Sequence, residues 1–205
     1  PSEAMSKSKK NVIDPEKMIK SYGADAVRWF ILSDSPPEKD VQWSNQGVNA
    51  AYKFLQKIYN LNYSILNRED CGQNNEVEFE TSFNSYVLKI TNLINNFQLN
   101  VAVANIYEIF NLFSSFEKKV VSNQCLKKNF VSFMKLMIPF TPFLAHECLE
   151  QLGIKEINNW PKIEKELIAS QKVKIAIQIN GKTREIIQVE KDLNEKDVIN
   201  ESKRN

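Results

Sequence analysis

Residues 48–66 read VNAAYKFLQKIYNLNYSIL, and this stretch decides the fold class. Apolar side chains recur in it three and four residues apart, at Val48, Ala51, Tyr52, Leu55, Ile58, Tyr59, Leu61, Ile65 and Leu66. That spacing gathers them on one face of an α-helix, whereas a strand would need strict alternation. The stretch therefore predicts a long amphipathic helix whose apolar face packs against other elements.

The helical pattern continues on the C-terminal side as far as Gly153, after a polar break at residues 70–76. The apolar stripes are Phe83, Val87, Ile90, Ile94 and Phe97; Val101, Ile106, Ile109, Phe110, Phe113 and Phe116; Phe130, Phe133, Met134 and Met137; and, after Pro142, Phe143, Leu144, Leu149 and Leu152. We interpret these stripes as core packing rather than as a cofactor site. They predict a mainly α fold, an antiparallel helical bundle.

The pattern changes after Trp160 and Pro161. Val173, Ile175, Ile177 and Ile179 alternate with polar or small residues, which is the period of a strand with one buried face. Asn180-Gly181 suits a tight hairpin turn, and residues 183–189 provide a second strand. Asn194 can cap a short helix from Glu195 onward. A hairpin and one helix are too little for a stable domain, so we expect a small α+β domain that this chain leaves incomplete.

Composition excludes several classes of protein. The chain has 205 residues and a formal net charge of +2, so only local basic patches could indicate nucleic-acid binding. Cys71, Cys125 and Cys148 have neither the number nor the spacing of a disulfide framework or a zinc site, and His146 is the sole histidine. No apolar run is long enough to cross a membrane. We expect a cytoplasmic protein and, because the chain begins with proline, a fragment of a longer one.

A lysine-rich stretch stands near the start of the chain. Residues 5–11 read MSKSKKN, and Asp14 and Pro15 then mark the beginning of a helix that Gly23 ends. An ammonium group on a flexible stem, beside backbone N–H groups, is a good partner for polyphosphate. A short basic run near a terminus is also typical of a solvated tail. The capped helix behind it favours a phosphate-binding loop hinged on a fixed element.

A second unusual stretch covers residues 23–44 and reads GADAVRWFILSDSPPEKDVQWS. It predicts a short helix, a rigid turn at Pro36-Pro37 and a charged loop that ends at Trp43. The chain thus predicts, in order, a lysine-rich loop, a capped helix, a short helix, a turn and a long helix.

In these two stretches the chain resembles class I aminoacyl-tRNA synthetases, most closely the bacterial leucyl subfamily. Residues 5–11 are similar to the Lys-Met-Ser-Lys-Ser loop, residues 23–44 to the connector into the helical bundle, and residues 173–189 to a hairpin of the C-terminal domain. The resemblance is most specific over residues 5–60; the middle of the chain is generic helical bundle. It implies part of an enzyme that activates leucine with ATP and transfers it to tRNA(Leu). Valyl, isoleucyl and methionyl relatives are the alternatives within this class.

The resemblance also implies roles for the loop residues. Met5, Ser6, Lys7 and Ser8 would bind ATP, and Lys7 would be the catalytic lysine that stabilises charge on the phosphates as the amino acid attacks. Ala4 stands where the motif usually has a lysine, so any contact from that position is in doubt. Magnesium is expected to accompany ATP, as in the family, with no metal ligands in this fragment.

The expected macromolecular partner is tRNA(Leu). Lys172, Lys174, Lys182 and Arg184 cluster around the expected hairpin and are candidate contacts to the phosphate backbone. They are equally consistent with solubilising charges on an exposed strand. ATP and leucine would be bound largely by the upstream part of a monomeric enzyme.

These expectations divide the chain into four parts. Residues 1–46 would end the catalytic domain, 47–153 would form the tRNA-binding helical bundle, 154–171 a linker and 172–205 the incomplete C-terminal domain. The alternative from another functional class is a non-catalytic RNA-binding accessory module that keeps the lysine loop as a relic. The enzyme fragment is expected to be inactive alone.

Overall fold

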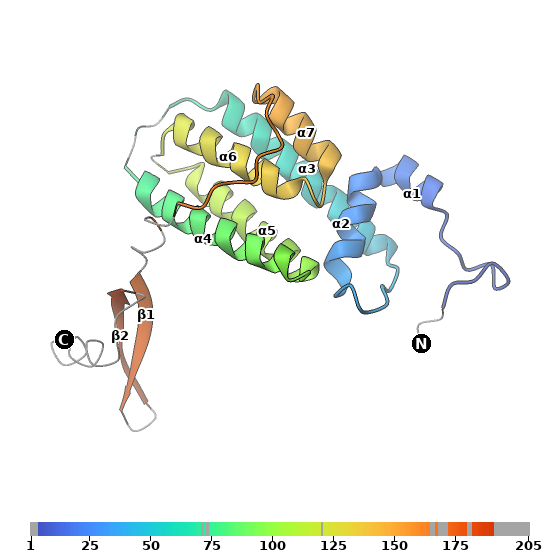
Figure 1. Cartoon of the computed structure of the whole chain (residues 1–205), viewed down its shortest axis with the longest axis horizontal. Helices are drawn as coiled ribbons and strands as arrows, with labels where there is room; N and C mark the ends of the chain where they lie inside the picture. The colour runs from blue at the N-terminus through green and yellow to red at the C-terminus, as the bar shows by residue number, and fades with distance from the viewer. Residues whose placement is uncertain are drawn as a thin grey trace.

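The computed structural model describes residues 4–70, 72, 74–119, 121–164, 167, 172–179 and 182–190. Its helices are α1 (Pro15–Tyr22), α2 (Ala24–Asp34), α3 (Asn45–Asn67), α4 (Glu76–Asn95), α5 (Leu99–Phe116), α6 (Asn123–Met137) and α7 (Pro142–Gln151), and its strands are β1 (Lys172–Ile179) and β2 (Lys182–Glu190). Figure 1 shows α3 to α7 side by side as a bundle, with α2 against one end and α1 beyond it. The predicted mainly α bundle is confirmed.

The long central helix begins earlier than its apolar pattern suggested. Ser44 caps α3, its Oγ accepting a hydrogen bond from the backbone N–H of Gly47 at 3.1 Å. Gly47 therefore lies inside the first turn instead of preceding the helix. A Cβ atom at this position would lie 2.4 Å from the ring of Phe30 on α2. The glycine is needed because α2 and α3 approach each other closely here.

Helices α2 to α7 share one hydrophobic core. Its largest fully buried side chains are Trp29, Phe79, Phe83, Phe113, Phe130, Phe133, Phe140, Ile58, Ile65, Ile90, Ile106 and Ile109. The apolar stripes predicted as core are mostly buried, but Tyr59, Phe97, Val101 and Phe143 are exposed. Phe97 is 61% exposed because it lies in the α4–α5 turn with a positive φ of 58°, and Phe143 is 68% exposed in the first turn of α7. Periodicity does not distinguish the last residue of a stripe from the turn that follows it.

Arg68 links the end of α3 to the connection between α5 and α6 through hydrogen bonds. Its guanidinium group donates hydrogen bonds to the carbonyl oxygens of Glu117, Lys119 and Val121, each at 2.7 or 2.8 Å, and to Oδ1 of Asn123 at 2.8 Å. Hydrogen bonds from a charged donor are stronger than neutral ones. This single side chain thus binds the carbonyl of Glu117, the C-cap residue of α5, and two carbonyls of the connection that follows it.

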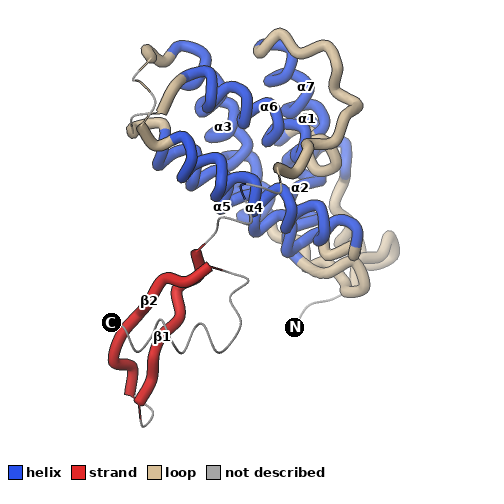
Figure 2. Tube along the Cα trace, turned by 60° about the vertical axis from the view of Figure 1, so that its left-hand side comes forward, coloured by secondary structure: helices blue, strands red, loops and turns tan. Residues whose placement is uncertain are grey.

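The segment after α7 crosses the bundle surface over α6 to reach α4 (Figure 1), and Figure 2 shows it as a tan loop on the outside of the helices. Trp160 Nε1 donates to Oγ1 of Thr91 at 2.9 Å, and the backbone N–H of Glu164 donates to Oδ1 of Asn84 at 3.1 Å. Lys128 on α6 pairs with Glu164 at 3.4 Å. Residues 154–164 are therefore attached to the bundle, although they form no regular helix or strand.

Strands β1 and β2 form an antiparallel hairpin, as predicted. The register pairs Val173 with Val189 and Ile175 with Ile187, and an irregularity falls between Ile177 and Gln178. The expected Asn180-Gly181 turn and the expected helix from Glu195 lie outside the described residues. The four domain boundaries drawn from the sequence remain predictions.

Candidate active site

The lysine-rich stretch folds into a short, closed loop. Asn11 closes it with both ends of its amide: Oδ1 accepts from the backbone N–H of Ser6 at 2.8 Å, and Nδ2 donates to the carbonyl of Ala4 at 3.3 Å. The Ser6 and Ser8 hydroxyls are 3.1 Å apart, and Lys10 turns the chain with a φ of 54°. The loop is a defined turn ahead of a capped helix.

Asn11 is a residue whose role the sequence did not reveal. Asparagine side chains often form hydrogen bonds with nearby backbone groups, and this tendency is the one feature of the sequence that could have indicated the role of Asn11. Its contact with Ala4 uses the backbone carbonyl, so the geometry of the loop is independent of the side chain at position 4. The alanine that replaces the motif lysine removes a charge without removing this contact.

Lys7 and Ser8 present groups suited to an anion. Both residues are exposed, and within the described part of the chain their backbone N–H groups have no acceptor. The N–H groups of Lys9 and Lys10, by contrast, donate within the turn to the carbonyls of Ser6 and Lys7, each at 3.2 Å. Open N–H groups beside an ammonium group form the kind of surface that binds phosphate oxygens.

The two stretches singled out in the sequence meet at one hollow. Ala4, Met5 and Asn11 line one side of it, and residues 40–43 line the other. Trp43 fixes the second side, because its Nε1 donates to Oδ1 of Asn45 at 2.9 Å and its ring packs edge-on against Phe30 at 5.4 Å. The loop is therefore adjacent to the segment that follows the Pro36-Pro37 turn.

The connector that follows the loop consists of α1 and α2, and it is attached to the bundle through α2. Asp14 accepts from the backbone N–H of Glu16 at 3.0 Å and caps α1, as predicted, and Gly23 with a φ of 81° separates α1 from α2. Trp29 on α2 is fully buried, and its Nε1 donates to the hydroxyl of Tyr107 on α5 at 3.1 Å. Movement of α2 would thus disturb the core of the bundle.

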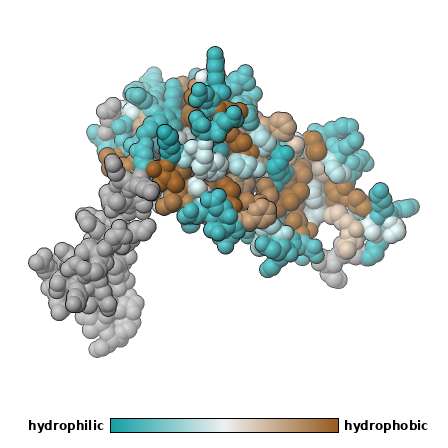
Figure 3. Space-filling model, in the orientation of Figure 1, coloured by the Kyte–Doolittle hydropathy of each residue, from teal (hydrophilic) through white to brown (hydrophobic). Residues whose placement is uncertain are grey.

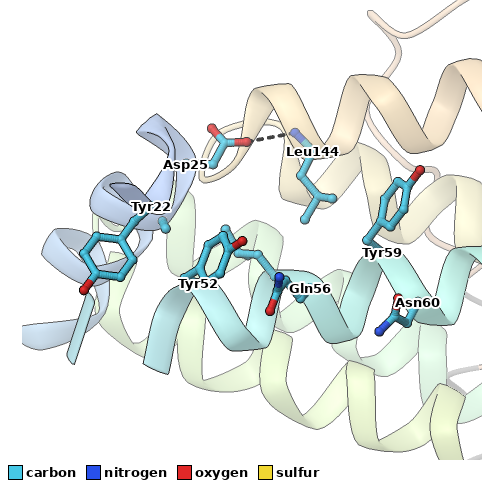
Figure 4. Close-up of a pocket in the computed structure, with 9 residues that line it drawn as sticks. Tyr22, Asp25, Tyr52, Gln56, Tyr59, Asn60 and Leu144 are labelled. Atoms are coloured by element: carbon cyan, nitrogen blue, oxygen red, sulfur yellow. Dashed lines mark hydrogen bonds between the residues drawn. The ribbon is translucent and has the colours of Figure 1, made fainter. Parts of the chain in front are cut away.

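Asp25 joins α2 to α7, a contact that the sequence did not reveal. Its Oδ2 accepts from the backbone N–H of Leu144 at 2.8 Å, and Figure 4 shows this bond spanning the two helices. Thr141, the N-cap residue of α7, makes no side-chain capping bond. Asp25 on α2 therefore accepts a hydrogen bond from one of the backbone N–H groups in the first turn of α7 that have no partner within the helix. Arg28 donates to the other carboxylate oxygen at 2.8 Å. Asp25 and Leu144 are 119 positions apart in the sequence, so no local pattern predicts the pair.

A groove lies beside this pair, between α2, α3 and α7 (Figure 4). Tyr22 and Tyr52 meet edge to face in it at 6.0 Å, and Gln56, Tyr59 and Asn60 continue its wall along α3. Its one carboxylate, Asp25, is already bonded to Leu144 and Arg28. The groove therefore offers no free acid or base for catalysis.

Replacing Asp25 by alanine should lower the free energy of unfolding by about 2 kcal/mol, because the N–H of Leu144 would lose its acceptor in a partly buried site. Urea unfolding followed by circular dichroism measures this. Asp25→Asn is the control, since it keeps an oxygen for Leu144, and we expect it to retain most of the stability. Equal losses in both variants would contradict the capping role.

The same carboxylate should make stability depend on pH. Burial raises the pKa of Asp25 above its ordinary value of 3.8, against the opposing effects of the Leu144 N–H and Arg28. The stabilising contribution linked to this raised pKa is complete below pH 3.8 and is lost as pH rises through the pKa of the folded state. Asp25→Asn should lack this component of the pH dependence.

The remaining sequence candidates lie elsewhere. Lys172 pairs with Glu190, Lys174 with Gln188 and Lys182 with Ile179 in the hairpin register, and Arg184 falls at the irregularity. These four residues thus belong to one hairpin but are separate from the lysine loop in sequence. Among the described residues, no group of three or more His, Cys, Asp and Glu side chains could hold a metal ion, and no helix is long and apolar enough to span a membrane.

The described cysteines are structural. Cys125 and Cys148 are free and buried, and Cys71 lies outside the described residues. Burial raises the pKa of each of the two buried thiols to about 12. They are protonated at neutral pH and are not nucleophiles there. His146 is exposed on α7.

The fold and the site define a class of protein in which a helical bundle follows a connector that carries a lysine-rich loop, and comparison with known families identifies this class. Residues 76–199, more than half of the chain, match the family described as the anticodon-binding domain of tRNA ligase. Residues 2–44 match the family of class I tRNA synthetases for isoleucine, leucine, methionine and valine. The chain belongs to the family of anticodon-binding domains of tRNA ligases.

Similar curated proteins are leucine–tRNA ligases. The protein from Parvibaculum lavamentivorans is 36% identical over 205 residues, covering 93% of this chain and 23% of the relative. The protein from Neorickettsia sennetsu is 37% identical over 210 residues, covering 98% of this chain and 24% of the relative. The chain thus spans about a quarter of the length of these relatives.

A solved structure shares the fold. It is the LeuRS chain of a ternary LeuRS–tRNA–LeuAMS complex from Agrobacterium radiobacter, which matches with a TM-score of 0.84 at 24% identity. The match covers 97% of this chain and 27% of that one. At this level of identity the comparison establishes the arrangement of the helices and no more.

Proposed function

We propose that this chain is part of a leucine–tRNA ligase, which activates leucine with ATP and transfers it to tRNA(Leu). The observation that carries the proposal is the loop of residues 4–11, whose exposed Lys7 and open backbone N–H groups are suited to polyphosphate, joined directly to a tRNA-ligase bundle. The similarity to curated leucine–tRNA ligases supports leucine over the other three amino acids of the class.

In the first step the leucine carboxylate attacks the α-phosphorus of ATP, and the bond to the pyrophosphate leaving group breaks. Lys7 would stabilise the negative charge that builds up on the phosphate oxygens, as a mobile point charge that can follow the leaving group. The N–H groups of Lys7 and Ser8 would hold the same oxygens. Met5, Ser6 and Ser8 would shape the loop around ATP, with the Ser6–Ser8 contact fixing its turn.

Magnesium would arrive with the phosphates of ATP. The described residues provide no cluster of acidic or imidazole ligands for it, so no residue of this chain is assigned to the ion.

The bundle and the hairpin would bind tRNA in the second step, when the leucyl group passes from the adenylate to the RNA. Membership in the anticodon-binding family supports an RNA contact for the bundle. Lys172, Lys174, Lys182 and Arg184 remain our candidates for phosphate contacts from the hairpin; such contacts position RNA without reading its bases.

Aminoacylation by the full-length protein tests this function. Labelled leucine should be transferred to tRNA(Leu) in an ATP-dependent reaction, and tRNA(Val), tRNA(Ile) and tRNA(Met) should remain uncharged. Binding of tRNA(Leu) without any charging would favour the non-catalytic RNA-binding module instead.

A further inference from the structure

The groove between α2, α3 and α7 has a lining of rings and amides to which the proposed function gives no role. Tyr22, Tyr52 and Tyr59 supply three rings, and Tyr59 is 41% exposed. Figure 4 shows Gln56 between Tyr52 and Tyr59 along α3, with Asn60 about one turn beyond Gln56. Both side-chain amides are exposed, and in the described structure neither forms a hydrogen bond. Ring faces therefore lie beside free hydrogen-bond donors and acceptors.

The groove is small and partly apolar. Ala26 and Leu55, both buried, and Leu144 complete its lining, and its volume is about 390 Å³. Pockets for small ligands have volumes of roughly 300–1,000 Å³, so this one suits a single ring system. Figure 3 shows hydrophobic residues (brown) among hydrophilic ones (teal) over the α2 end of the bundle, so the surface there is mixed as well. A planar ring with apolar faces and polar edges matches this lining.

The charges are divided between the groove and its edge. Asp25 is the one charged residue in the groove lining of the described structure, and its carboxylate already has two hydrogen-bond partners. A phosphate group would meet this negative charge, so the groove does not suit one. Lys53 and Lys57 lie on α3, each one residue after a lining side chain, and both are exposed with no ion pair in the part of the chain that the structure describes. The groove therefore suits an uncharged ring whose attached phosphates lie outside it.

A base in an RNA strand has this combination of groups. Unpaired bases in folded RNA can turn out of their stack, rest on aromatic side chains and form hydrogen bonds along their edges. Lys53 and Lys57 are about one helical turn apart, so they can meet the phosphates on the two sides of one nucleotide, which a free mononucleotide lacks. Helices α4 to α7 of the same bundle belong to the match with the anticodon-binding domain of tRNA ligase, which favours RNA as the occupant.

We propose that this groove binds one unpaired base of the tRNA, an inference that rests on the proposed function. The base would stack on Tyr59, and the Gln56 amide would form hydrogen bonds with its edge. Lys53 and Lys57 would bind the flanking phosphates. A contact of this kind depends on which base is present, whereas the phosphate contacts proposed for the hairpin position RNA without reading its bases. The groove would thus contribute to the choice among tRNAs.

Binding of tRNA to the full-length protein tests the base site. Unfractionated bacterial tRNA is the probe, and its Kd is measured by filter binding at several salt concentrations, without leucine or ATP. Gln56→Ala and Tyr59→Ala should each raise Kd at least about fivefold, because losing a base-edge contact or a stacked ring reduces affinity to this degree. The matched controls Gln46→Ala and Tyr63→Ala, at exposed sites on α3 outside the groove lining, should leave Kd unchanged.

Salt dependence separates the base contact from the phosphate contacts. Lys57→Ala should lower the slope of log Kd against log salt concentration by about 1, since one phosphate contact is lost, whereas Gln56→Ala should leave the slope unchanged. Tyr59→Phe keeps the ring and should bind tRNA as tightly as the wild type. Equal losses in Tyr59→Phe and Tyr59→Ala would refute stacking, because they would assign the effect to the hydroxyl group that bonds to Gln151.

Equal Kd values in the Gln56→Ala variant and the Gln46→Ala control would overturn the proposal. An excess of AMP that displaces tRNA from the wild type but not from Gln56→Ala would also overturn it, by showing that a free mononucleotide occupies the groove. The measurement needs no catalysis, so the two proposals can fail separately. An affinity that depends on Gln56 in a protein that charges no tRNA with leucine would leave the base site intact and refute the ligase. Leucine charging with equal affinities in all variants would do the reverse.

Discussion

Replacing Lys7 by alanine in the full-length protein should lower leucine-dependent ATP–pyrophosphate exchange at least about tenfold, since a charge that stabilises a transition state contributes a few kcal/mol. The ammonium group of Lys7 is exposed on a closed loop, and in the described structure it forms no ion pair. The variant therefore loses a charge that makes no ion pair in the described folded structure. Its stability should be unchanged while its activity falls.

The control for Lys7 is another exposed lysine close by in the chain. Lys20 lies in the last turn of α1, outside the loop, and Lys20→Ala should retain the exchange rate. A Lys7→Ala enzyme as active as the wild type, or two variants with equal losses, would remove Lys7 from the catalytic mechanism.

Replacing Phe113 by alanine should destabilise the bundle by about 4 kcal/mol, the usual range for removing a fully buried aromatic ring. Phe113 has no exposed surface, and its ring lies 5.1 to 5.7 Å from those of Phe79, Phe83, Phe130 and Phe133. These four rings come from α4 and α6, so Phe113 on α5 joins both helices. Its loss would leave a cavity where three helices meet.

Phe143→Ala is the matched control, since it makes the same chemical change at a ring that is 68% exposed. Its effect on the free energy of unfolding should stay within about 0.5 kcal/mol. Urea unfolding of the two variants measures the difference. Similar losses in both would mean that the rings between α4, α5 and α6 do not form the centre of the core.

The sequence predicted most of the fold because apolar spacing records which face of each helix is buried. Ile58 and Phe113 belong to stripes with the helical period, and both are fully buried. Phe97 and Phe143 have the same spacing but lie where a helix ends or begins, so the pattern assigned them wrongly. The apolar pattern began only at Val48, because it does not show the Phe30 ring that requires a glycine at position 47, inside the first turn of α3.

The candidate site was predictable only in part, for a related reason. The loop residues and the cap at Asp14 are local, and their roles follow from short-range chemistry. Asp25 caps a helix that begins more than a hundred residues later, and Asn11 acts through the backbone of Ala4 and Ser6. Such contacts depend on the tertiary fold, which brings distant parts of the chain together, and they cannot be predicted from one short stretch of sequence.

The dependence of ATP–pyrophosphate exchange on the amino acid, measured with the full-length protein, tests the central claim most directly. Isotope should enter ATP rapidly with leucine and far more slowly with isoleucine, valine or methionine. Exchange driven by one of those three in place of leucine, or no exchange with any amino acid, would contradict the assignment of this chain to a leucine–tRNA ligase.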